Sequence, residues 1–308
     1  MTADSSDARL PETRLRRAVH FVPGANEKML TKSLGLEADS LVLDLEDAVT
    51  PDRKDEARAV VSGWLKDVDF GRQERVVRPN PLDTPWGLDD LRATMVTPPE
   101  AYLVPKVSTL ADVQAVDAEL TRLEDEYGHP AGATRLLLVA TETPRGVLNL
   151  PSFPECPRVA GMTWGAEDLS AAIGARRNRD ESGAYLDVFR HCRVQTLLAA
   201  TAGGVQPIDS VYVDIRNLDD LRDECRHGAW MGFTGKVTIH PDQIPIVNEA
   251  FTPSEAERAE AQELLDAFVE AEAEGRMAFS FKGQMVDVPH LRRAQTIVDR
   301  AQQAVDQS

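Results

Sequence analysis

Charged side chains that could act on a small molecule recur along the chain, each directly after a short apolar run. A set of carboxylates without the Cys and His spacing of a zinc site suits a hard divalent ion such as Mg²⁺. Proteins hold this ion with one or two carboxylates plus water and substrate oxygens. An arginine facing such an ion could bind a substrate carboxylate or stabilise a developing oxyanion. In chain order the residues are Glu46, Asp47, Arg78, Lys106, Glu142, Glu167, Asp168, Asp214 and His240.

These residues can share one site only if the apolar runs are strands of one sheet. The runs are rich in Val, Leu, Ile and aromatic residues and too short for helices, which is typical of buried parallel strands. Stretches with apolar residues three and four apart lie between them and predict helices over 26–38, 51–68, 109–128 and 187–204. The eight runs are 18–24, 40–47, 75–80, 101–107, 135–143, 159–168, 209–216 and 236–241.

Eight strands that alternate with helices predict a closed (β/α)8 TIM barrel. An open doubly wound sheet is the alternative, but that fold normally carries a glycine-rich phosphate loop. Neither G-x-G-x-x-G nor G-x-x-x-x-G-K-[ST] occurs here. We therefore favour the barrel.

The active site of such a barrel lies at the carboxyl ends of its strands, so the charged residues should meet at one mouth. Glu142 and Asp168 follow adjacent strands and are the best-placed pair of metal ligands. Both could instead be ordinary acids at a helix start, where the helix dipole favours them. Glu46 and Asp47 could likewise be loop or capping acids.

The basic residues also have structural readings. Arg78 could pair with a neighbouring acid, Lys106 reads as structural, and His240 before a proline reads as packing. It is the convergence of so many charged groups on one face that indicates a metal-dependent enzyme acting on a small anion.

Composition excludes several other classes of protein. The net charge of −17 argues against nucleic-acid binding, which relies on Lys and Arg to neutralise phosphates. No apolar run is long enough to span a membrane, and the first residues lack the apolar stretch of a secretory signal. Cys156, Cys192 and Cys225 are far apart, which suggests reduced thiols in a cytoplasm.

The chain divides into three expected parts: a disordered lead-in over 1–16, the barrel over 17–250, and a C-terminal helix and lid over 251–308. The last part contains a capped polar helix over 251–275. It then has an apolar pair, a Lys-Gly turn and a lone acid, Asp287. From the residues alone, Asp287 reads as the N-cap of a helix that begins at Pro289.

Several motifs together resemble the HpcH/HpaI aldolase and citrate lyase β-subunit family, from Arg17 to Ala301. Within it they are most similar to stand-alone citramalyl-CoA and malyl-CoA lyases. The motifs are FVPGANEKM, LVLDLEDAVTPDRKDEAR, VRPNPLDTPWG, LVPKV, ETPRG, GAEDLS, GFTGKVTIHPDQIPIVNEAFTPS and MVDVPHLRRA.

The resemblance implies a Mg²⁺-dependent barrel that forms trimers or hexamers. It also implies cleavage or formation of a carbon–carbon bond in a 3-hydroxyacyl-CoA thioester. The products of cleavage would be acetyl-CoA and a 2-oxo acid such as pyruvate or glyoxylate.

The resemblance also implies roles for single residues. Glu142 and Asp168 correspond to the metal ligands, and Glu46 and Asp47 to acids that hold metal-bound water. Arg78 corresponds to a catalytic arginine that binds substrate together with Glu142. Asp287 corresponds to a catalytic acid that a neighbouring subunit's lid supplies. The CoA contacts correspond to Phe21, Lys28, Lys32, Val213 and Asp214.

Two other functions remain open at this point. One is a citrate lyase β-subunit that acts on an acyl-carrier protein, and the other is a non-catalytic metabolite-binding barrel. The resemblance is also incomplete at Arg145 and in the charged loop 174–189. Both could reshape the pocket for the 2-oxo acid.

Overall fold

The computed structural model describes residues 14–307, which form two compact units. Within these residues the barrel unit is Arg16–Asn248, and the C-terminal unit is 249–307 together with Arg14 and Leu15. Most of the expected lead-in, residues 1–13, lies outside the described residues. Arg16, the last residue of that expected segment, is buried and paired with Glu74.

Eight parallel strands close into a barrel in the order β1 to β8, each paired with its sequence neighbours and β8 with β1. The predicted (β/α)8 fold is therefore confirmed. The strands are β1 Ala18–Pro23, β2 Ser40–Asp44, β3 Glu74–Arg78, β4 Ala101–Val104, β5 Arg135–Val139, β6 Val159–Thr163, β7 Gln206–Asp209 and β8 Gly235–Thr238.

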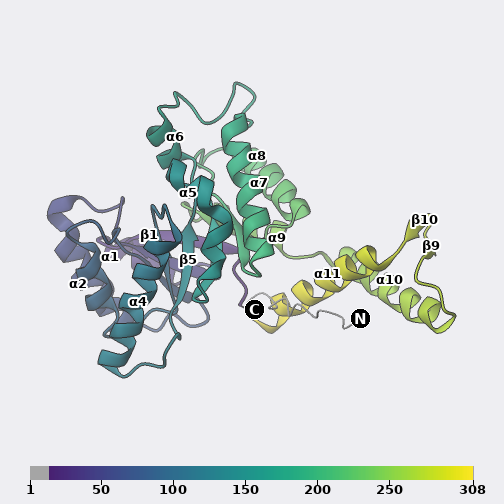
Figure 1. Ribbon diagram of the computed structural model, residues 1–308, viewed down its shortest axis with the longest axis horizontal. Coiled ribbons are helices and arrows are strands. Elements are labelled where there is room, and N and C mark those ends of the chain that lie inside the picture. Colours follow the sequence, from purple (N-terminus) through teal and green to yellow (C-terminus); the bar gives the residue numbers. More distant parts are fainter. Residues whose placement is uncertain (1–13, 308) are drawn as a thin grey trace. The chain divides into compact units, whose positions relative to one another are not determined.

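Helices connect the strands and surround them (Figure 1). The sequence explains their ends: Thr109 and Asp112 form a capping box at the start of α4, and Gly128 ends it in the left-handed conformation. The helices are α1 Glu27–Ser33, α2 Lys54–Asp67, α3 Gly87–Thr94, α4 Leu110–Tyr127, α5 Pro144–Asn149, α6 Glu167–Ile173, α7 Asp187–Ala202, α8 Leu218–Met231 and α9 Gln243–Phe251, with 3-10 turns at Pro51–Arg53 and Leu150–Glu155. No helix of the described residues is both long and apolar enough to cross a membrane.

One predicted strand is misplaced. The run 209–216 was expected to be the seventh strand, but β7 is Gln206–Asp209 and the segment after it is a loop. Pro207 lies inside the real strand, and a proline argues against a strand in sequence analysis. The consecutive apolar and aromatic residues 211–213 were therefore the stronger but misleading signal.

The amino-terminal end of the barrel is closed by a buried ion pair. The Arg16 guanidinium donates to both carboxylate oxygens of Glu74, at 2.6 and 2.8 Å, and to Gln206 Oε1 at 2.7 Å. The Ser40 hydroxyl donates to Glu74 Oε2 at 2.6 Å. Above this layer the interior is apolar and includes Val42, Leu137 and other branched side chains. Polar chemistry is thus left to the opposite end.

The C-terminal unit contains α10 Glu255–Ala273, a hairpin of β9 Phe279–Phe281 and β10 Gln284–Val286, and α11 Val288–Asp306. Lys282 and Gly283 form the turn, both with positive φ, as a type I′ hairpin requires. Phe268 and Phe279 pack edge to face, 4.9 Å between ring centroids, in a small apolar core.

Candidate active site

Lys106 lies at the centre of the charged residues at the barrel mouth, two residues beyond the end of β4. Its ammonium contacts Glu46 and lies 3.3 Å from Asp47 and 3.4 Å from Asp168. Its backbone has a positive φ of 56°, and its N–H donates to Glu142 Oε2 at 2.6 Å. Burial acts to lower the pKa of Lys106, but contact with Glu46 raises it overall, so the side chain stays charged.

Glu142 is the most deeply placed of the expected metal ligands, with only 5% of the residue exposed. Burial raises its pKa to about 8, and the charges of Glu46 and Asp168 add to the effect. The Thr141 hydroxyl accepts a hydrogen bond from the Gly165 N–H at 2.9 Å, which joins the ends of β5 and β6. A Cβ at position 165 would lie 2.8 Å from Glu142 Cγ, so glycine is required beside this acid.

Arg78 ends β3 inside the barrel and is held by two acids. Its guanidinium forms two hydrogen bonds of 2.7 Å to Asp44, its register partner on β2, and lies 3.0 Å from Glu46. The ring of Phe21 lies 4.6 Å from the guanidinium carbon. Arg78 therefore does pair with a neighbouring acid, as its structural reading supposed, and it does so at the mouth.

Sequence reasoning missed three buried residues behind the site: Asp44, Lys54 and Asn80. The Lys54 ammonium donates to the carbonyls of Leu45 and Glu46 and to Asn80 Oδ1, at 2.7 to 2.8 Å. It thereby ties the loop after β2 to the loop after β3, and burial lowers its pKa. Asp44 could have been found from strand alternation, which places it inward two residues before Glu46.

The other expected site residues lie on neighbouring loops and helices. Lys28 and Lys32 are exposed on α1 and form no ion pair within residues 14–307. Val213 and Asp214 are exposed in the loop after β7. His240 follows β8, with its Nδ1 3.6 Å from Asp242, and does not join the central cluster.

The loop over 174–189 is held in place by contacts of Arg179 with Tyr185 in the same loop and with Glu224 of α8. The Arg179 guanidinium stacks on Tyr185, 3.6 Å from the ring centroid, and pairs with Glu224 of α8 at 2.7 Å. Asn178 donates to Glu167 at 2.6 Å, beside Asp168. Arg145 is exposed in the first turn of α5. These positions can therefore shape one side of the mouth.

The donor set fits a divalent cation. Glu142 and Asp168 offer only carboxylate oxygens, the type of ligand that Mg²⁺ prefers, and both contact Lys106, Glu142 through the backbone N–H and Asp168 through the ammonium. Within residues 14–307 no three Asp, Glu, His or Cys side chains form a complete ligand set. A metal here would therefore take its remaining ligands from water and substrate.

Asp287 belongs to the C-terminal unit, where it immediately precedes α11. Its carboxylate is half exposed and lies 2.6 Å from His290 Nδ1. The prediction that Asp287 is the N-cap of this helix is confirmed, and α11 begins at Val288, one residue before the expected Pro289.

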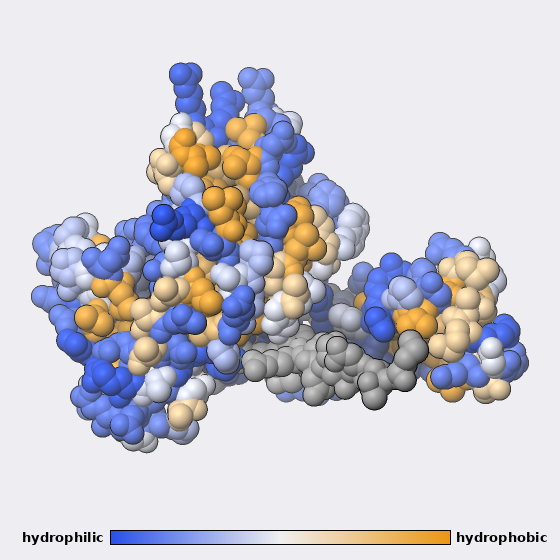
Figure 2. Space-filling model, viewed as in Figure 1, coloured by the Kyte–Doolittle hydropathy of each residue, from blue (hydrophilic) through white to orange (hydrophobic). Residues whose placement is uncertain are grey.

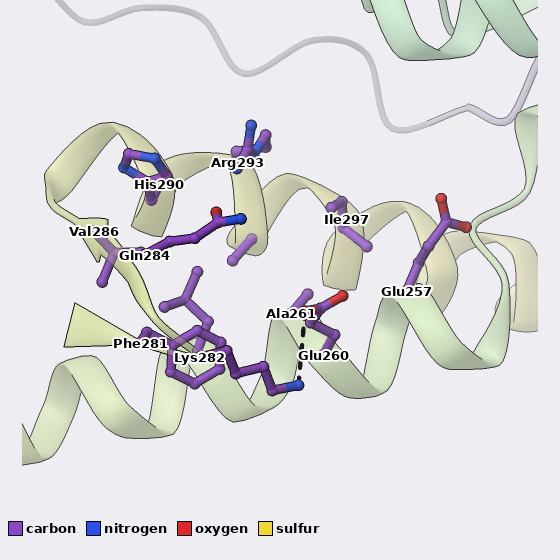
Figure 3. A pocket seen from close by; sticks show the side chains of 12 residues that line it. Glu257, Glu260, Ala261, Phe281, Lys282, Gln284, Val286, His290, Arg293 and Ile297 are labelled. Atoms are coloured by element: carbon purple, nitrogen blue, oxygen red, sulfur yellow. Dashed lines mark ion pairs between the residues drawn. The ribbon is translucent and has the colours of Figure 1, made fainter.

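His290 also lines a pocket of about 350 Å³ between α10, the hairpin and α11 (Figure 3). Lys282 reaches Glu260 at 3.6 Å along one side of this pocket. Asp287 is not among the lining residues.

The sequence profile of the HpcH/HpaI aldolase/citrate lyase family matches residues 17–241. The chain belongs to this family. It is therefore an enzyme of the carbon–carbon lyase class, as the resemblance implied.

Individual relatives agree with the family assignment over nearly the whole chain. The (3S)-malyl-CoA thioesterase of Cereibacter sphaeroides is 37% identical over 286 residues, which cover 93% of this chain and 94% of the relative. The mitochondrial citramalyl-CoA lyase of Mus musculus is 36% identical over 300 residues, 93% of this chain and 86% of the relative.

A crystal structure of the Mycobacterium tuberculosis protein CitE, in complex with magnesium, acetoacetate and coenzyme A, is similar in fold. It superimposes with a TM-score of 0.78 at 35% identity and covers 94% of this chain and 100% of that one. This chain thus shares its fold with a protein whose crystal structure holds magnesium and coenzyme A.

Proposed function

We propose that this family member is a Mg²⁺-dependent lyase that cleaves or forms a 3-hydroxyacyl-CoA thioester such as citramalyl-CoA or malyl-CoA. The products of cleavage are acetyl-CoA and a 2-oxo acid, pyruvate or glyoxylate. The observation that carries the proposal is the convergence of three acids on Lys106, next to Arg78: Glu46 and Asp168 face its ammonium, and Glu142 accepts from its backbone N–H.

Glu142 and Asp168 would hold the Mg²⁺, with Glu46 and Asp47 bound to its water. When bound, the ion supplies a Lewis acid and template for the oxygens of the 2-oxo acid. The burial of Glu142 suits this role because a buried carboxylate is stabilised most by a cation placed directly against it. The remaining chemistry falls to residues of the chain itself.

Arg78 would bind the carboxylate or developing oxyanion of the substrate. Its two hydrogen bonds to Asp44 and its contact with Phe21 fix the plane of the guanidinium before substrate arrives. A preorganised donor stabilises developing charge without rearrangement during the reaction.

Coenzyme A would lie along α1 and the loop after β7. Lys28 and Lys32 are four residues apart on one exposed helix face and can meet CoA phosphates. Phe21, Val213 and Asp214 would contact the rest of the thioester chain.

Asp287 would act as the base, supplied by the C-terminal unit of a neighbouring copy. It would take the hydroxyl proton during cleavage, or a proton from the thioester methyl during condensation. A carboxylate is a weak base in water, so closure of the lid must exclude solvent around it.

A homo-oligomer, trimer or hexamer, follows from a base supplied in this way. Apolar surface on the barrel unit supports it. Exposed apolar side chains gather over α5, α6 and α7 (Figure 2), and monomers rarely expose large patches of this kind. The exposed apolar residues of these three helices include Leu148, Ile173, Val194 and Leu198, of which Leu148 is 83% exposed.

We also place the enzyme in a cytoplasm, because its three cysteines are all free and buried. No nucleic acid or membrane takes part in the proposed reaction.

The test is a condensation assay with Mg²⁺, acetyl-CoA or propionyl-CoA, and glyoxylate, pyruvate or oxaloacetate, read by mass spectrometry of the CoA pool. We expect one new acyl-CoA with one oxo acid. Asp287→Asn should abolish it, because an amide cannot take up the proton. Asp299→Asn is the matched control in the same unit and should retain wild-type turnover. An Asp287→Asn enzyme with near-normal turnover would remove Asp287 from the mechanism.

Thioester hydrolysis is the second candidate, favoured by the relative that is a (3S)-malyl-CoA thioesterase. The same assay separates the two, since hydrolysis releases free CoA and a hydroxy acid. If CoA binds but no thioester changes, a carrier-protein substrate, as for a citrate lyase β-subunit, replaces the free CoA ester. The other function consistent with that result is a non-catalytic, metabolite-binding protein.

A further inference from the structure

Three carboxylates from different parts of the barrel meet the same lysine side chain. Glu46 follows β2, Asp168 follows β6, and both face the ammonium of Lys106, which follows β4. Asp47 supplies the third carboxylate, 3.3 Å from the ammonium. Like charges gathered at the barrel mouth repel one another unless a cation lies between them. Lys106 supplies that cation from within the chain.

The two contacts that Lys106 makes are separable. Its backbone N–H donates to Glu142, and this bond does not depend on the side chain. The ammonium contacts the other acids on a flexible four-carbon stem that can change rotamer at low cost. A substitution of the side chain therefore removes the cation while leaving the amide of residue 106 against Glu142.

The contacts of the ammonium are also unequal. Glu46 is its nearest partner and is only 5% exposed, whereas Asp168 lies 3.4 Å away and is 35% exposed. The lysine can release Asp168 while it keeps Glu46. Asp168 is the acid that the proposed function assigns to the metal.

We propose that the Lys106 side chain is an internal counter-cation that competes with the divalent metal for these carboxylates. It holds the mouth together in the metal-free enzyme and releases Asp168 when the metal binds. The inference rests on the proposed function in so far as Glu142 and Asp168 are the metal ligands. Because the metal must displace the ammonium, the protein binds the metal more weakly than the same carboxylates would without Lys106.

The test is calorimetric titration of metal-free protein with MgCl₂, without substrate. Lys106→Met should bind Mg²⁺ more tightly than wild type, by about tenfold or more, because no internal cation has to be displaced. Lys106→Arg keeps the charge and should remain near the wild-type affinity. Lys66→Met removes an exposed lysine in the last turn of α2 and should not change the affinity.

Thermal unfolding supplies a second readout. Without metal, Lys106→Met should unfold at a lower temperature than wild type, and saturating Mg²⁺ should narrow the gap. A variant too unstable to titrate is measured by the rise of its unfolding midpoint with MgCl₂ concentration, which should be half complete at a lower concentration than for wild type.

Weaker or equal Mg²⁺ binding by Lys106→Met would overturn the inference, because it would make the lysine a support of the metal site rather than a competitor. Failure of the wild type itself to bind Mg²⁺ would instead refute the metal dependence in the proposed function. The two failures are therefore distinguishable.

Discussion

The buried ammonium of Lys54 holds the loop that carries Glu46 at the barrel mouth. Among the described residues, 14–307, Lys54 donates only to neutral oxygens, although an ammonium buried without a touching carboxylate is costly. What it provides is position: Glu46 is fixed through its own carbonyl, and Glu46 in turn contacts Arg78 and Lys106. The position of these charged groups therefore depends on a residue that is buried behind them.

His20 on β1 makes stability depend on pH. It is 4% exposed, its Nδ1 lies 3.0 Å from the Thr238 hydroxyl, and burial, with a smaller effect of His240, lowers its pKa to about 4. An unfolded histidine has a pKa near 6.5, so folding favours the neutral ring. The stabilisation is complete above about pH 6.5 and is lost as the pH falls to about 4, a total of about 3 kcal/mol.

Denaturant unfolding of wild type and His20→Gln between pH 7 and pH 4 measures this contribution. The wild type should lose more stability than the variant across this window, by roughly the amount above. His191→Gln, at an exposed histidine of α7, should keep the wild-type slope. Parallel profiles for wild type and His20→Gln would contradict the prediction.

The strands and helices are the scale at which the sequence was most informative. Short apolar runs separated by helical spacing suffice for a barrel, because they fix which segments are buried on both faces. They also place Glu46, Glu142 and Asp168 at strand ends. Lys106 was read as structural because its importance comes from acids 36 to 62 positions away in sequence, and no local pattern encodes that convergence.

The hairpin of the C-terminal unit gives a prediction at this scale. Gly283 has a φ of 81°, where a side chain costs about 1 kcal/mol. Gly283→Ala should lower the free energy of unfolding of this unit by about that amount. Gly63→Ala should act in the opposite sense, since Gly63 lies inside α2 and its added Cβ would meet no atom within 4 Å. Urea denaturation of both variants measures the two changes in the free energy of unfolding. A stabilising Gly283→Ala would show that the turn differs from the type I′ form.

In the barrel as a whole, the buried Arg16–Glu74 ion pair and the charged residues of the candidate active site lie at opposite ends. Arg16 and Glu74 close the amino-terminal end, far from any strand's carboxyl terminus. Because both are buried, Arg16→Met leaves an uncompensated carboxylate and should cost about 3–5 kcal/mol. The double variant Arg16→Met, Glu74→Gln should recover part of this loss.

Chemical denaturation of Arg16→Met, Glu74→Gln and the double variant gives the free energy of interaction between the two side chains. Arg122→Met is the contrasting control, because Arg122 pairs with Glu119 and Glu126 on the exposed face of α4. Its loss should cost less than about 1 kcal/mol. Equal costs for Arg16→Met and Arg122→Met would mean that the buried pair contributes no more than a surface one.

The glycine beside Glu142 restricts how the substrate range of this enzyme could be redesigned. Position 165 is already as small as a residue can be, and any larger residue would displace the acid next to it. A saturation library at this position would therefore return only glycine among its active clones. For the proposed 2-oxo acid substrates, a change in size would have to be accommodated elsewhere, by Arg145 and the loop over 174–189, whose exposed side chains can vary without moving Glu142.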